Sequence, residues 1–124
     1  MTAAYSYIAS GAIPEGALVS PYSTTADTVV VNPAAASPIG RAKAAAASGE
    51  TVVCDTLVIG KSYLMIAAGV IAENAEVFTA ANGKVQKKTT ATLALVGRAK
   101  GTASTDGDLI WVTYNPIAAV AQAT

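Results

Sequence analysis

GRAK, at Gly40–Lys43, recurs in this chain of 124 residues at Gly97–Lys100, each time directly after a branched aliphatic residue. The similarity extends well beyond the two tetrapeptides. When the sequence is shifted by 58 residues, 8 of the 16 positions from 4 to 19 are identical, whereas an alanine-rich composition gives roughly one in ten by chance. We therefore interpret the chain as a duplication of one unit, with copies at about 4–55 and 62–113.

The identical positions are small or apolar residues, together with one aromatic and one acidic residue. They match Tyr5, Ile8, Ala9, Gly11, Ile13, Glu15, Ala17 and Val19 with Tyr63, Ile66, Ala67, Gly69, Ile71, Glu73, Ala75 and Val77. The two GRAK segments align at a shift of 57, and the shift returns to 58 before Gly49 aligns with Gly107. One copy therefore contains one additional residue between these points.

Substitutions between the copies indicate turns. Gly16 is matched by Asn74, and these residue types adopt positive φ most readily, so a turn is predicted at both positions. Gly49 and Gly107 each follow a turn-forming residue and precede a β-branched or apolar run. Asn82-Gly83 is the strongest hairpin signal, because a type I′ turn needs positive φ at both central residues.

The pattern predicts an all-β chain of about ten short strands with at most short helical turns, arranged as a compact barrel or sandwich with internal pseudo-twofold symmetry. An alternative is a helix over 41–47, because RAKAAAA has high helix propensity. The matched segment 98–104 contains Gly, Thr and Ser, so we expect a strand followed by a loop in both copies. The strands are expected at 5–9, 17–22, 28–31, 39–43, 51–55, 63–67, 75–79, 84–88, 93–100 and 108–114, with 57–59 linking the halves.

Composition limits both the size of the fold and its partners. The length predicts one domain with a single core, in which Trp111 is expected to be buried. Eight basic and eight acidic residues leave no net charge at pH 7, which argues against nucleic acid as a partner. No stretch approaches the roughly 20 apolar residues of a membrane span, so no membrane partner is expected.

No motif in the sequence supports catalysis, a cofactor or a metal site. The chain has no histidine, and Cys54 is its only cysteine, which we expect to be buried in a strand. Gly60-Lys61-Ser62 resembles the end of a phosphate-binding loop, but the required upstream glycine is replaced by Asp55. We predict neither an enzyme nor a protein with a small-molecule substrate.

Three segments carry a resemblance to a known family. The order of alanine, glycine, acidic and β-branched residues in 40–55, 68–85 and 96–112 resembles the small capsid decoration (cement) proteins of tailed bacteriophages. The resemblance implies a β-tulip-like structural protein of the virion, made in the host cytoplasm and placed on the outer capsid surface. It also implies a homotrimer that binds the major capsid protein and stabilises the head against internal DNA pressure. The alternative is a head-fibre or adhesin-type β module that binds host surface glycans.

The ends of the chain depart from that family's pattern. Tyr5, Tyr7 and Ile8 lie in an aromatic N-terminal stretch, and an apolar tail follows Pro116. Such short apolar terminal arms can grip a partner, and a first strand with an unpaired edge can extend a partner's sheet. We therefore expect Tyr5, Tyr7 and Ile8 to contact the capsid. An ordinary first strand of the barrel is the alternative, and the tail after Pro116 is the next candidate.

Overall fold

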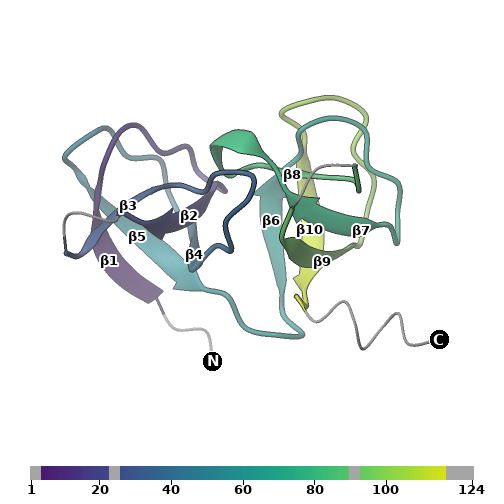
Figure 1. Ribbon diagram of the computed structural model, residues 1–124, viewed down its shortest axis with the longest axis horizontal. Coiled ribbons are helices and arrows are strands. Elements are labelled where there is room, and N and C mark those ends of the chain that lie inside the picture. Colours follow the sequence, from purple (N-terminus) through teal and green to yellow (C-terminus); the bar gives the residue numbers. More distant parts are fainter. Residues whose placement is uncertain (1–3, 23–25, 90–92, 117–124) are drawn as a thin grey trace.

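The computed structural model describes residues 4–22, 26–89 and 93–116, and it is all-β in those ranges (Figure 1). Ten strands and one short 3₁₀ turn form two lobes. The elements are β1 (Ala4–Ala9), β2 (Leu18–Pro21), β3 (Thr28–Val31), β4 (Gly40–Ala42), β5 (Thr51–Thr56), β6 (Ser62–Ile66), β7 (Glu76–Thr79), η1 (Ala81–Gly83), β8 (Val85–Gln86), β9 (Leu95–Ala99) and β10 (Leu109–Tyr114). The all-β fold class predicted from the sequence is confirmed.

The first lobe is a closed five-stranded barrel. Its strands follow the order β1-β3-β2-β4-β5, and β5 pairs with β1 to close the barrel. The pairing of β1 with β3 is parallel, while the other four pairings are antiparallel. A closed barrel removes exposed strand edges, which is how a small β domain avoids unwanted pairing.

The second lobe repeats this arrangement. Its sheet has the order β6-β10-β9-β7-β8, which is the order of the matched strands in the first lobe. A single parallel bridge between Ala67 and Val85 replaces the longer parallel pairing of β1 with β3. The two copies therefore share one strand order, and they differ in how firmly the parallel contact closes the barrel.

The turns are matched in their backbone geometry. Gly16 has φ of +87° and Asn74 of +70°, and their N–H groups donate to the carbonyls of Ala42 and Ala99, both at 2.9 Å. Gly49 and Gly107 also have positive φ and donate to β1 and to the residue directly after β6 at 2.8 and 2.7 Å. Each copy therefore uses the same turn hydrogen bonds.

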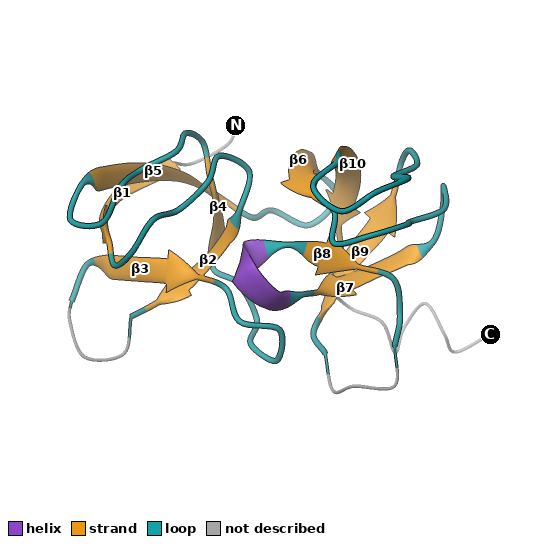
Figure 2. Ribbon diagram, turned by 90° about the horizontal axis from the view of Figure 1, so that it is seen from above, coloured by secondary structure: helices purple, strands orange, loops and turns teal. Residues whose placement is uncertain are grey.

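The Asn82-Gly83 turn lies in η1, between the two lobes (Figure 2). Both residues have positive φ, of 62° and 75°. Thr79 pairs with Val85 across the turn, so the connection is longer than the two residues of a type I′ hairpin. Asn82 and Gly83 form the short 3₁₀ turn together with Ala81.

The glycine of each GRAK segment lies where two strands approach closely. A Cβ on Gly40 would lie 2.7 Å from the carbonyl oxygen of Asp55, and a Cβ on Gly97 would lie 1.8 Å from that of Thr113. The alanines two residues later, Ala42 and Ala99, are fully buried in the two cores. The repeated tetrapeptide therefore combines a close strand crossing with a small core residue.

The molecule has two hydrophobic cores, not the single core expected from its length. Each lobe encloses its own cluster of buried, mainly aliphatic side chains, because each five-stranded sheet curls around its own inward-facing residues. The clusters exchange one residue each: Leu18 of the first copy belongs to the second core, and Ile66 of the second copy belongs to the first. This exchange joins the lobes.

Trp111 is 53% exposed, so the expectation that it is a core residue is wrong. It lies in β10 between Ile110 and Val112, both of which are buried. Because side chains alternate along a strand, the strand that buries these two neighbours turns Trp111 outward. Large size alone does not decide burial here.

Candidate functional site

The described residues contain no cluster of three or more His, Cys, Asp or Glu side chains that could hold a metal ion. Cys54 is buried in β5, and burial, followed by the nearby charge of Asp55, raises the pKa of its thiol to about 11. A thiol with so high a pKa is a poor nucleophile at neutral pH. In the ranges that the structure describes, no helix is long and apolar enough to cross a membrane.

The expected contact residues lie in β1, but the strand divides them between its two faces. Side chains alternate along a strand, so Tyr5 and Tyr7 share the face of buried Ala9, and Ile8 lies on the other face. Tyr7 packs against the first core, where burial is the main cause that raises its pKa. Tyr5, which is 56% exposed, and Ile8 at 43% are therefore the accessible members.

β1 is a barrel strand. It pairs with β5 from Ala4 to Ile8, and with β3 at Ile8 and Ala9. Among the described residues, the edge of β1 that faces β3 has no pairing before Ile8. Removing residues 1–8 would therefore take most of a strand out of the barrel. Met1–Ala3 and the tail from Ile117 lie outside the described residues.

Arg41 holds the two lobes together. Its Nη1 donates to Asp55 Oδ2 at 3.0 Å, and its Nε donates to the carbonyl of Leu64 in β6. Lys43 Nζ lies 3.9 Å from the other oxygen of Asp55. The side chains of Arg41 and Asp55 are both largely shielded from water. The first GRAK arginine thus links β4 and β5 of one lobe to β6 of the other.

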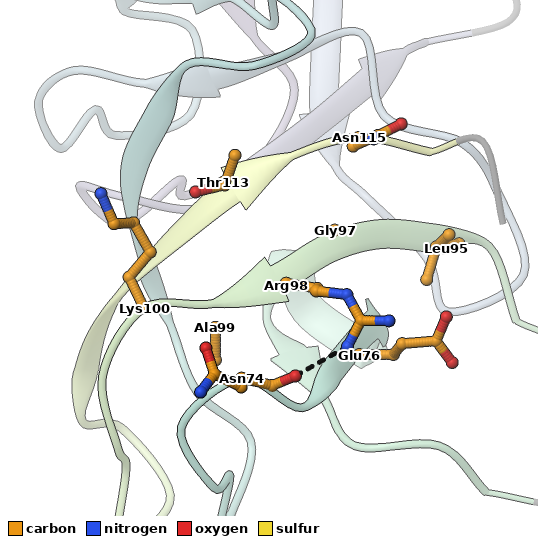
Figure 3. A pocket seen from close by; sticks show the side chains of 9 residues that line it. All are labelled: Asn74, Glu76, Leu95, Gly97, Arg98, Ala99, Lys100, Thr113 and Asn115. Atoms are coloured by element: carbon orange, nitrogen blue, oxygen red, sulfur yellow. Dashed lines mark hydrogen bonds between the residues drawn. The ribbon is translucent and has the colours of Figure 1, made fainter. Parts of the chain in front are cut away.

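Arg98, the matched arginine, faces an open hollow of about 370 Å³ on the second lobe (Figure 3). Its Nη1 donates to the carbonyl of Asn74 at 2.8 Å, and the side chain extends toward Glu76. The position that matches Asp55 is Thr113, which also lines the hollow. The same repeat position is therefore an internal clamp in one copy and a surface cation in the other.

Further bonds join the lobes around the clamp. The carbonyl of buried Asn32 accepts from the N–H of Gly83 at 2.9 Å, and Thr79 Oγ1 donates to the carbonyl of Ala34. A Cβ on Gly83 would lie 3.0 Å from that of Ala17. The lobes are consequently in close backbone contact at η1.

The clamp formed by Arg41 was not among the site residues predicted from the sequence. A signal was present in the residues that differ between the copies. Asp55 is matched by Thr113 and Leu18 by Glu76, and such changes of charge or polarity indicate that matched positions have different surroundings.

Exposed apolar side chains lie on the outer face of β10. Leu109 and Trp111 are two residues apart and both exposed, and Trp111 is paired with Leu64 of β6. Lys100 and Ser62 border the hollow beside Trp111. This face offers an apolar surface with a cation at its margin.

No protein-family model matches the chain, and no curated protein matches it in sequence. Among solved structures, it is similar to the head fiber gp8.5 N base of bacteriophage phi29, with a TM-score of 0.76 and 16% sequence identity. The match covers 94% of this chain and 96% of that chain. At this identity the similarity establishes a shared fold over nearly the whole of both chains.

Proposed function

We propose that this protein is a decoration protein of a tailed-phage head, which binds the outer capsid surface as a homotrimer and reinforces the shell. The observation that carries the proposal is the full-length similarity in fold to a phage head fiber base. The sequence resemblance to capsid decoration proteins points to the same part of the virion independently of that fold.

The chemistry of the surface supports a binding role. Exposed apolar side chains such as Leu109 and Trp111 can be removed from water by a partner, at about 25 cal/mol per Å². Each copy would bury a modest area, and linking three copies in a trimer would strengthen retention through avidity. Binding to a repetitive shell fits this pattern.

Tyr5 is the side chain that we propose for the capsid contact. It is exposed, whereas its match Tyr63 is buried and its hydroxyl donates to the carbonyl of Thr56 at 2.9 Å. Replacing Tyr5 leaves the backbone pairing of β1 intact, so Tyr5→Ala tests the contact without removing a strand. Val70, which is also exposed, provides the control Val70→Ala on the other lobe.

The test is co-sedimentation of the purified protein with phage heads that lack it, followed by heating of the particles. We expect the protein to sediment with the heads and to raise the temperature at which they release DNA. Tyr5→Ala should weaken binding, while Val70→Ala should not. Failure to sediment with any head would contradict the proposal.

A second candidate is the base of a head fibre, or an adhesin-type module that binds host surface glycans. The name of the similar structure, a head fiber base, favours it. Here the measurement is adsorption of decorated and undecorated particles to host cells, together with binding to host glycans. Glycan binding and faster adsorption would support this candidate, and equal adsorption would leave reinforcement of the shell as the role.

A further inference from the structure

Matched positions of the two copies differ in burial, and the differences outline the contact between the lobes. Leu18 is 0% exposed, whereas its match Glu76 is half-buried. Ile66 is 8% exposed, whereas its match Ile8 is 43% exposed. Because the barrels have the same strand order, the burial that only one copy shows arises where the other copy covers it.

The two lobes use different faces for this contact. The first lobe contributes a face formed by Gly16, Leu18 and Arg41 of β2, β4 and the preceding turn, which we call the donor face. The second lobe contributes Leu64 and Ile66 of β6 and Gly83 of η1, which we call the acceptor face. The chain is thus a twofold repeat in sequence and strand order, but the contact between its copies joins unlike faces.

Joining unlike faces leaves one of each kind uncovered. The donor face of the second lobe consists of Asn74, Glu76 and Arg98, and these residues line the hollow in Figure 3. The acceptor face of the first lobe consists of Ser6, Ile8 and Asp27, all exposed. Both are the repeat-matched equivalents of faces that already bind each other within the chain.

We propose that a second copy of this chain docks its first lobe onto the second lobe of this one, so that the contact inside the chain is repeated between chains. Arg98 then donates to the carbonyl of Ser6, as Arg41 does to that of Leu64. Ile8 takes the place of Ile66 beside Asn74, the match of Gly16, whose added Cβ would lie 3.5 Å from Ile66.

One pair of side chains across these faces is opposite in charge. The N–H of Ser10 donates to Val29 and that of Ala68 donates to Val85, so residues around β3 and β8 match at a shift of 56. This shift matches Asn32 with Lys88 and Asp27 with Gly83. Asn32 and Gly83 are hydrogen-bonded within the chain, so the repeated contact places Lys88 beside Asp27, an opposite charge. Arg98 and Ile8 retain the residue types of Arg41 and Ile66.

The contact between chains is more polar than the one inside the chain. Glu76 replaces Leu18, and Ser6 replaces Leu64. Less apolar area is buried, so the association is weaker than the tethered contact and responds to salt. A contact between unlike faces closes into a ring when the rotation allows and otherwise extends as a filament. A homotrimer of this kind would contain six lobes, and only this stoichiometry rests on the function proposed above.

The test mixes two variants that each add one cysteine, Asp27→Cys and Ala75→Cys, under glutathione oxidation. Their matched positions are Gly83 and Ala17, where a Cβ added to Gly83 would lie 3.0 Å from that of Ala17, near the 3.5–4.5 Å typical of a disulfide. The native Cys54 is buried and poorly ionised, so it does not compete. We expect a disulfide-linked dimer in the mixture, formed at least about tenfold faster than with either variant alone.

Cross-linking of each variant with itself measures contact between like faces. Cross-linking of Asp27→Cys with Ser48→Cys measures the rate of random collision. Arg98→Ala in both partners should slow the cross-linking, whereas the rate should be unchanged by Lys61→Ala, which removes a cation outside both faces. Equal rates in all mixtures at protein concentrations up to about 1 mM would overturn the proposal. So would cross-linking of Asp27→Cys with itself. The cross-linking rates are measured on protein without capsids, so their outcome does not depend on whether the protein binds a capsid.

Discussion

Arg41 and Arg98 occupy the same position in the two copies of one repeat, yet one is an internal clamp and the other a surface group. Arg41 is paired with Asp55 and reaches the other lobe, whereas Arg98 bonds to Asn74 of its own lobe. The strand order around each arginine is the same. The difference therefore arises from what covers the barrel, and it shows that a duplicated unit can keep its fold while its surfaces take separate roles.

The two lobes also differ in closure. β1 pairs with β3 over two residue pairs, while a single bridge joins the matched segments in the second lobe. Each core also receives one residue from the other copy, Leu18 in the second core and Ile66 in the first. The lobes therefore depend on each other, and substitutions at matched positions should have unequal effects.

The largest effect is expected at the glycines of the two GRAK segments. Gly97→Ala should lower the free energy of unfolding by about 3 kcal/mol or more, because its Cβ would overlap the carbonyl of Thr113. Gly40→Ala should be milder, since its nearest backbone atom is 2.7 Å away. Gly101→Ala is the control, because nothing lies within 4 Å of its added Cβ. Urea unfolding measures all three, and equal losses at Gly40 and Gly97 would contradict the comparison.

The next effect concerns the residue that crosses between the cores. Leu18→Ala removes a fully buried side chain from the second core and should lower stability by about 3 kcal/mol. Glu76→Ala at the matched position should change it by less than about 1 kcal/mol. Hydrogen exchange of β6 and β10 would show whether Leu18→Ala loosens the second lobe first. Loosening confined to the first lobe would argue against the exchange of core residues as the link.

A smaller difference is expected between the two arginines. Arg41→Ala leaves the shielded carboxylate of Asp55 with only the distant Lys43, which should lower stability by about 2 kcal/mol. Arg98→Ala should lower it by no more than about 0.5 kcal/mol, because the side chain is exposed. Thermal unfolding of the two variants gives the comparison directly. An Arg98→Ala protein as unstable as Arg41→Ala would mean that the two positions are alike.

The smallest expected effect is a pH dependence at the turn before β10. The carboxylate of Asp108 accepts hydrogen bonds from the N–H groups of Ser104 and Thr105, and these bonds lower its pKa below 3.8. A lowered pKa in the folded state stabilises the protein above about pH 4, and this contribution is lost as pH falls through the folded pKa. Asp108→Asn should therefore be less stable at neutral pH, with a difference that shrinks on acidification.

Glu50→Gln is the matched control for this measurement. In the first copy, Glu50 accepts one backbone N–H, that of Ala47, where Asp108 accepts two. Its effect at neutral pH should be smaller. A difference between Asp108→Asn and the parent that stays constant down to pH 2 would exclude the charge as the cause.

Much of the fold could be predicted from the duplication. Each of the ten strands lies where the pattern of apolar and turn residues placed it, with ends that differ by a few residues. The 41–47 segment begins as β4 and continues as a loop, because Ala42 fills the first core and Ala46 bridges to Ile13. The repeat makes the prediction stronger because two different sequences must both fit the same strands and turns.

The surfaces could not be predicted in the same way. Trp111 and Ile66 have similar apolar character, but only the packing of one lobe on the other decides which is covered. The separation of Tyr5 and Ile8 onto two faces follows from the predicted strand, while the packing of Tyr7 on the core required knowing which face of β1 lines the barrel. Contacts between copies depend on geometry that no single repeat contains.

Ser104 shows how this architecture accommodates length variation. Ala46 of the first copy matches Ala103 of the second, a shift of 57 residues, and the next residue, Ala47, matches Thr105, a shift of 58. Ser104 is therefore the additional residue of the second copy. Hydrogen bonds on both sides of this change remain equivalent: those of Ala46 and Ala103 before it, and those of Gly49 and Gly107 after it. The connection has thus absorbed an insertion without altering the strands, and it is where a foreign peptide could be displayed on the folded protein.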